Sequence, residues 1–145
     1  MSAISFLLNL LWIVFGGLAM AAGWAIAGIV MAITIIGIPW ARAAISIAKY
    51  ALLPFGSKAV SRAEHTGQED IGTGPIGTIG NIIWLILAGW WLALGHVIFA
   101  VILFITIIGI PFGWAHLKLA GLALWPIGKE IVPADAMPTG YPRRE

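Results

Sequence analysis

The sequence predicts an all-α integral membrane protein with two tandem repeats, and two observations lead to this fold class. First, Met1–Ala41 and Ile71–Leu117 contain no Lys, Arg, Asp or Glu, and an uncharged apolar run of about 18 residues is already long enough for a membrane helix. Second, three separate sequence blocks recur with a constant spacing of 72 residues. A fixed spacing without insertions is typical of a duplicated structural unit.

The repeated blocks set the limits of the repeats. They start at Asn9 and Asn81, at Thr34 and Thr106, and at Leu53 and Trp125. We therefore assign residues 5–56 to a first repeat, 57–75 to a polar connector, 77–128 to a second repeat and 129–145 to a flexible tail. The connector is rich in Gly and Thr, and the tail contains three prolines, as expected of solvated segments.

Each repeat opens with an apolar stretch of 35 residues, 4–38 and 76–110. As one helix this stretch would measure roughly 52 Å, whereas a hydrocarbon core is about 30 Å thick. As a helical hairpin, its two arms would each measure about 24 Å. Both interpretations, a hairpin and a long broken helix, remain open. Four basic residues follow each stretch, and the cytoplasmic preference of Lys and Arg favours the hairpin, with both termini in the cytoplasm.

A shorter helix is expected to follow each apolar stretch, over residues 40–53 and 112–125. Pro39 precedes the first of them, and proline suits the first turn of a helix. Arg42 and Lys49 share one face of it, so it is predicted to lie at the membrane interface as an amphipathic helix. In the rival interpretation it crosses the bilayer, which would place Lys49 and Lys118 near mid-membrane at a cost of roughly 2.5–3.5 kcal/mol each.

Four polar residues in the apolar body are candidates for function. Asn9 and Asn81 occupy equivalent positions, as do Thr34 and Thr106. They can either form hydrogen bonds between helices or line a pore. A threonine hydroxyl is easily satisfied by its own helix, which favours the first interpretation more strongly for the threonines.

His96 breaks the repeat symmetry, because its counterpart in the first repeat is Trp24. In a hairpin it would lie near the turn, whereas in a long helix it would be embedded and a titratable candidate for function. The sequence contains no cysteine, no carboxylate in the apolar body and no spaced set of histidines. We therefore predict no catalytic residue, no metal site and no cofactor.

Small residues at Ala19, Gly23 and Ala27 have larger counterparts at Trp91 and Phe99, around Gly95. This difference predicts knob-and-hole packing between the two repeats or between subunits.

The charges in the apolar body are all basic. Arg42, Lys49 and Lys118 form a basic fringe that suits the anionic lipids of the cytoplasmic leaflet, or anions. A dense basic surface is missing from the sequence, which argues against nucleic acid as a partner. A chain this short has little interior of its own, so we expect a homo-oligomer in the lipid bilayer.

The doubled blocks resemble the YccF-type inner membrane component domain of bacteria. The matching elements are Asn81-Ile82-Ile83-Trp84, Gly89-Trp90-Trp91, Ile107-Ile108-Gly109-Ile110-Pro111 and Leu124-Trp125-Pro126-Ile127-Gly128. This resemblance covers both repeats. It implies a small multi-pass protein of the bacterial inner membrane and brings no catalytic residues with it.

Two functions fit these features. The first is a homo-oligomeric pore or transport component for ions or small solutes, lined by the Asn and Thr candidates, with the basic fringe at its cytoplasmic mouth. The alternative is an accessory or scaffold membrane protein that binds lipid head groups or a partner protein. Neither function is enzymatic.

Overall fold

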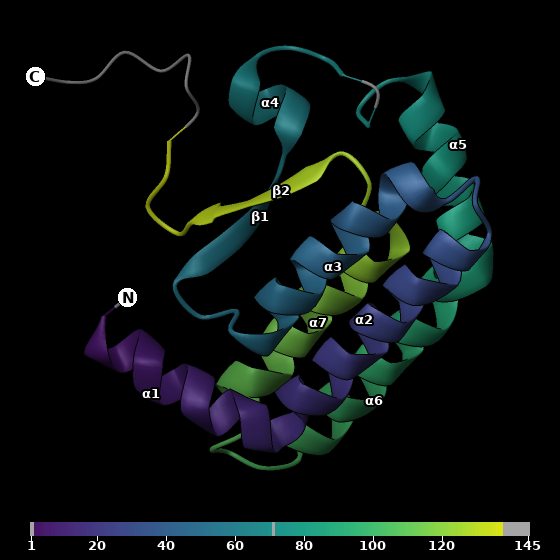
Figure 1. Cartoon of the computed structure of the whole chain (residues 1–145). Helices are drawn as coiled ribbons and strands as arrows, with labels where there is room; N and C mark the ends of the chain where they lie inside the picture. Colours follow the sequence, from purple (N-terminus) through teal and green to yellow (C-terminus); the bar gives the residue numbers. More distant parts are fainter. Residues whose placement is uncertain (1, 71, 138–145) are drawn as a thin grey trace, which may run out of the picture.

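The protein is described by a computed structural model for residues 2–70 and 72–137 (Figure 1). The first repeat contains α1 (Ala3–Trp12), the π-helical turn η1 (Ile13–Gly17), α2 (Leu18–Ile33) and α3 (Ile38–Leu52). The second repeats this order with α5 (Pro75–Trp84), η2 (Leu85–Gly89), α6 (Trp90–Phe104) and α7 (Ile110–Leu124). Between and after them lie β1 (Ser57–Ser61), α4 (Arg62–Thr66) and β2 (Lys129–Pro133).

Each repeat is a long broken helix followed by a helix that folds back on it. The first parts run over Ala3–Ile33, 31 residues, and Pro75–Phe104, 30 residues, and both are long and apolar enough to cross a membrane. Of the two predicted forms of each apolar stretch, the long broken helix is therefore confirmed and the hairpin is wrong. The chain reverses only at the Thr-Ile-Ile-Gly block, after which α3 packs along α2 and α7 along α6. The glycines inside the stretch allow a kink and close packing instead of a reversal.

The kink in the first repeat is sharper than that in the second. Phe15 leaves helical geometry with φ −90° and ψ 33°, and Gly16 has φ +104°. Its counterpart Ala88 has no positive φ. Because L-residues with a side chain rarely adopt positive φ, the sharper kink requires glycine at this position.

The two repeats pack through an antiparallel contact between α2 and α6. Gly23 lies beside Leu92, and Gly95 lies beside Met20. These two contacts are equivalent after a shift of 72 residues, so the repeats are related by an approximate two-fold rotation. Trp91 also lies beside Gly23, whereas Phe99 lies beside Gly16, so both large side chains of the second copy pack on glycines of the first.

The antiparallel arrangement sends the two helix turns to opposite ends of the bundle (Figure 1). Both turns are apolar and exposed. Ile36 is 71% exposed at the α2–α3 turn, and its counterpart Ile108 is 76% exposed at the α6–α7 turn.

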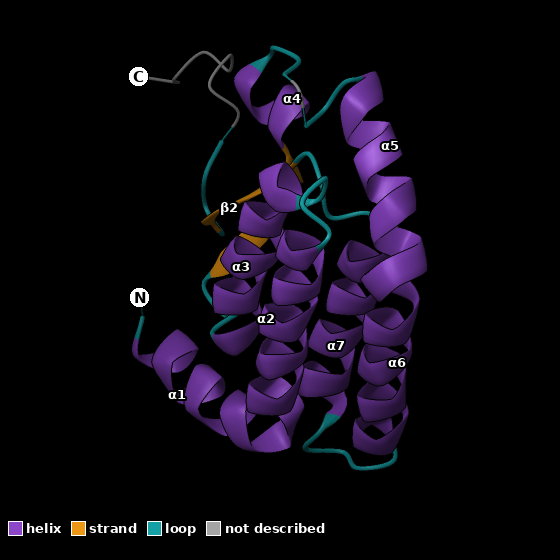
Figure 2. Cartoon of the chain, turned by 45° about the vertical axis from the view of Figure 1, so that its right-hand side comes forward, coloured by secondary structure: helices purple, strands orange, loops and turns teal. Residues whose placement is uncertain are grey.

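A two-stranded antiparallel ribbon joins the ends of the repeats. β1 pairs with β2, with Ser57 opposite Pro133 and Ser61 opposite Lys129. The segment predicted to be a flexible tail therefore begins with an ordered strand, while residues 138–145 lie outside the described part. We call residues 57–70, 72–74 and 129–133 the polar cap. Figure 2 shows the strands of the cap along the side of α3, which β2 contacts, and α4 beyond the upper end of α3.

Candidate functional site

Asn9 and Asn81 hold the turn that follows the last helix of their own repeat. The Asn9 amide nitrogen donates to the Phe55 carbonyl at 2.9 Å, and the Phe55 N–H donates to the Asn9 carbonyl oxygen at 2.9 Å. Asn81 makes the same pair of bonds with Ile127, at 3.0 and 2.9 Å. Both asparagines are buried. Each asparagine thus ties the first helix of its repeat to the turn that follows the last one, and the lining of a pore stays a prediction.

An indole beside each asparagine adds a second duplicated bond. Trp12 Nε1 donates to the Ala51 carbonyl, and Trp84 Nε1 donates to the Ala123 carbonyl, both at 2.7 Å. These carbonyls belong to the last turns of α3 and α7, where helix carbonyls lack partners within the helix. The Asn-x-x-Trp block therefore links the first helix of each repeat by hydrogen bonds to the end of the last helix and to the turn after it.

Thr34 and Thr106 close the two apolar turns. The Thr34 hydroxyl donates to the Met31 carbonyl at 2.6 Å and accepts from the Gly37 N–H at 3.0 Å. Thr106 makes the equivalent bonds to Leu103, at 2.9 Å, and Gly109, at 3.0 Å. Both hydroxyls are thus used to end one helix and begin the next.

A buried chain of hydrogen bonds connects the two repeats. Trp24 Nε1 lies 3.0 Å from His96 Nε2, His96 Nδ1 lies 2.9 Å from His116 Nδ1, and His116 Nε2 lies 3.1 Å from the Phe15 carbonyl oxygen. Both histidines are fully buried. His116 also stacks on Phe99, with ring centroids 5.2 Å apart.

The partners at the two ends fix the proton positions in these hydrogen bonds. An indole N–H can only donate, so His96 Nε2 accepts and the proton of a neutral His96 is on Nδ1. His116 Nδ1 then accepts a hydrogen bond from His96 Nδ1–H, and His116 Nε2–H donates to the Phe15 carbonyl. Since a Trp indole does not pass protons on and a backbone carbonyl does not take them up, these bonds anchor the kink and do not form a proton path.

The repeat pattern singles out His96 as a candidate, but not its partner. His116 replaces Ala44 of the first repeat, just as His96 replaces Trp24. These two departures from the repeat are the signal that could have linked the histidines. No group of three or more His, Cys, Asp or Glu in the described residues could hold a metal ion.

A cleft of about 540 Å³ lies between α3 and the polar cap. Its walls are Pro39, Trp40, Arg42, Ala43, Ser46 and Ile47 of the α3 side, and Arg62, Asp70, Gly72, Ile127, Gly128, Lys129, Glu130 and Ile131 of the opposite side. Three cations and two carboxylates line it, so its net charge is positive. No sequence pattern indicates this cleft, because it joins the first repeat to the connector and to the segment that follows the second repeat.

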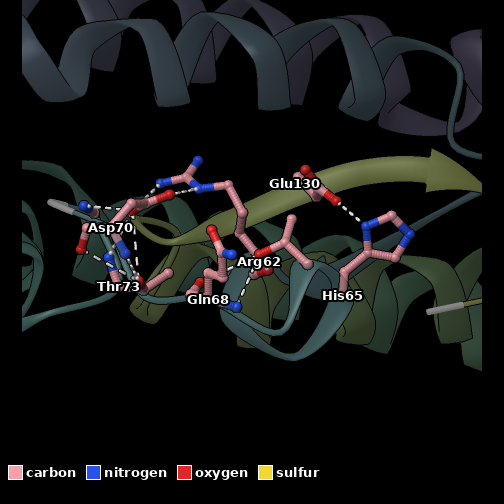
Figure 3. Close-up of polar contacts among 8 residues, drawn as sticks. Arg62, His65, Gln68, Asp70, Thr73 and Glu130 are labelled. Atoms are coloured by element: carbon pink, nitrogen blue, oxygen red, sulfur yellow. Dashed lines mark hydrogen bonds and ion pairs between the residues drawn. The ribbon is translucent and has the colours of Figure 1, made fainter. Parts of the chain in front are cut away.

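The carboxylates of the cleft already have partners within the cap (Figure 3). Asp70 forms two bonds with the Arg62 guanidinium, at 2.5 and 3.0 Å. Its Oδ1 also accepts the backbone N–H groups of Gly72 and Thr73. The hydrogen bond from Arg62 and these N–H groups hold the pKa of Asp70 below its usual value. Glu130 lies beside His65.

The predicted basic fringe does not gather in one place. Arg42 lines the cleft, whereas Lys49 and Lys118 do not. Lys49 is exposed further along α3, and Lys118 is exposed midway along α7.

The chain is similar to known inner membrane proteins over both repeats. The family model of the YccF inner membrane component domain matches twice, at residues 7–57 and 79–129. The chain is 39% identical over 129 residues to inner membrane protein YccF of Escherichia coli (strain K12), covering 88% of this chain and 87% of that relative. Inner membrane protein YccF of Shigella flexneri matches with the same identity and coverage. No solved structure is significantly similar.

Proposed function

The chain belongs to the family of the YccF inner membrane component domain, and we propose that it is a non-enzymatic accessory protein that enters the inner membrane from the cytoplasmic side. In this proposal the helices lie in lipid along the membrane plane, and the polar cap faces the cytoplasm. The predicted cytoplasmic placement of both termini is part of it.

The distribution of charge is the observation that carries this proposal. The cap holds seven charged residues: Lys58, Arg62, Glu64, Glu69, Asp70, Lys129 and Glu130. By contrast, both helix turns and much of the surface of α2 and α6 expose aliphatic side chains. A protein with one polar side and apolar surface elsewhere suits insertion from one face of a bilayer.

Helices perpendicular to the membrane would fit this surface poorly. The β1–β2 ribbon lies along the side of α3 (Figure 2), so its unpaired backbone edges would then lie in hydrocarbon, where each unsatisfied group costs several kcal/mol. Lys118 would lie near mid-membrane at a cost of roughly 2.5–3.5 kcal/mol. The exposed Ile36 and Ile108 would lie in the two head-group regions. A helix along the interface lets the long Lys118 side chain reach the head groups.

The pore predicted from the sequence has less support. Its lining candidates bond within their own repeat, as Asn9 does with Phe55 and Thr34 with Met31. Homo-oligomerisation, on which a pore would depend, stays a prediction.

Planar-bilayer recording of the purified protein separates the two functions. We expect no unitary current from protein that is folded by circular dichroism and present in the bilayer. Reproducible currents whose conductance changes in Asn81→Leu, but not in Thr78→Val, an exposed change on the same helix, would overturn the accessory role.

A further inference from the structure

We propose that the cleft between α3 and the polar cap binds the phosphate head group of an anionic glycerophospholipid. This inference rests on the proposed function, because insertion from one side brings the cleft to the level of the lipid head groups.

The charges of the cleft leave two cations for a ligand. Asp70 bonds with Arg62, and Glu130 lies beside His65. Within the described residues, no ion pair involves Arg42 or Lys129. They approach the cleft from different elements, one from α3 and the other from the start of β2. Two cations that line the same cleft from different elements are suited to bind a phosphate.

The remaining lining favours a lipid over a soluble anion. Trp40, Ala43 and Ile131 are half-buried and give the cleft apolar surface that a free phosphate would not contact favourably. Pro39 and Trp40 form the end of the cleft nearest the α2–α3 turn, where Ile36 and Ile38 are exposed. A ligand with a phosphate and acyl chains can therefore place its charge between Arg42 and Lys129 and its chains along this apolar end.

The surroundings of the cleft do not suit nucleic acid. Glu64 and Glu69 lie on the cap together with the cleft-lining Asp70 and Glu130. These carboxylates would repel a polyanion that covers the whole cap, whereas one head group need only reach the two cations.

The test is a titration of the detergent-purified full chain with short-chain phosphatidylglycerol, followed by native mass spectrometry. Short-chain phosphatidylcholine and inorganic phosphate serve as comparison ligands. The variant is Arg42→Gln with Lys129→Gln. Lys49→Gln is the matched control, because it removes a cation from the same helix as Arg42 but outside the cleft.

We expect the double variant to lose about tenfold or more in affinity for phosphatidylglycerol, and Lys49→Gln to bind as the unchanged protein does. Phosphatidylcholine should bind at least about tenfold more weakly, and inorganic phosphate should not compete at equal concentration. Arg42→Lys should restore most of the binding lost in Arg42→Gln, which a misfolded variant would not do.

Three results would overturn the proposal: equal lipid binding by the double variant, equal loss in Lys49→Gln, or competition by inorganic phosphate as strong as by lipid. Failure of the proposed function gives a different pattern. In that case the bilayer recordings show current while the double variant still loses lipid binding, and the cleft assignment stands.

Discussion

His116 in the second repeat donates a hydrogen bond to the carbonyl oxygen of Phe15 in the first, at 3.1 Å. The Phe15 carbonyl is at the kink of the first long helix, where the backbone leaves helical φ and ψ. One side chain from the second repeat thus binds a backbone carbonyl at this kink. Ala44, the counterpart of His116 in the first repeat, has no hydrogen-bond donor in its side chain. The second long helix has Ala88 where the first has Gly16.

His116→Ala should destabilise the protein by at least about 2 kcal/mol. It leaves the Phe15 carbonyl and the His96 Nδ1–H buried without a partner, and it opens a cavity. The free energy of unfolding in detergent micelles measures this effect. Lys118→Ala, an exposed change on the same helix, should alter it by less than about 0.5 kcal/mol. Equal effects of the two changes would contradict the anchoring role of His116.

Gly16→Ala and Ala88→Gly test the asymmetry of the kinks. A Cβ at Gly16 would lie 2.6 Å from Phe99 Cδ1, at a φ of +104°, so we expect a loss of roughly 2–4 kcal/mol. Ala88→Gly should cost only about 1 kcal/mol, as is usual for glycine in a helix. The same unfolding measurement compares them, and a larger loss in Ala88→Gly would show that the kinks are misassigned.

Asn9→Leu and Asn81→Leu should reduce stability by similar amounts, about 1–3 kcal/mol each, because each removes the same two bonds to part-buried or buried backbone groups. Asn9→Asp should lose less than Asn9→Leu, since it still accepts from the Phe55 N–H. Thermal unfolding of the three variants in one detergent checks the order. A large loss in only one repeat would argue against equivalent roles.

The Arg62–Asp70 contact predicts a pH dependence of the cap. Because the folded pKa of Asp70 is lowered, its stabilising contribution is complete above the ordinary aspartate pKa of about 3.9. That contribution is lost as the pH falls through the lower, folded value. Amide exchange of residues 72–74 should therefore become less protected at low pH. Asp70→Asn should show weak protection at every pH, whereas Glu69→Gln should behave as the unchanged chain.

Much of this fold is predictable because the duplication is visible in the residues. The constant spacing of 72 residues is enough to pair Asn9 with Asn81 and Pro39 with Pro111. The amphipathic face of α3 is also predictable from its sequence: Ala44 and Ile47 are buried, while Arg42 is exposed.

Other features depend on contacts that no local pattern encodes. Glycine permits both turns and close packing, so the apolar stretch is compatible with a hairpin, and only packing against the other repeat decides between the two. The pairing of β1 with β2 joins segments about 70 residues apart, each with charged residues typical of loops. The cleft follows from that pairing, and so it is not predictable either.

Labelling of single cysteines at the two helix turns tests insertion from one side most directly, because the chain has no cysteine of its own. Ile36→Cys and Ile108→Cys would be treated with a membrane-impermeant maleimide in spheroplasts and in inside-out vesicles, with Glu69→Cys in the cap as the control. We predict that the cap cysteine reacts only in inside-out vesicles and that neither turn reacts until detergent is added. Reaction of one turn from the periplasmic side and of the other from the cytoplasmic side would show that the helices cross the membrane, and would contradict the account.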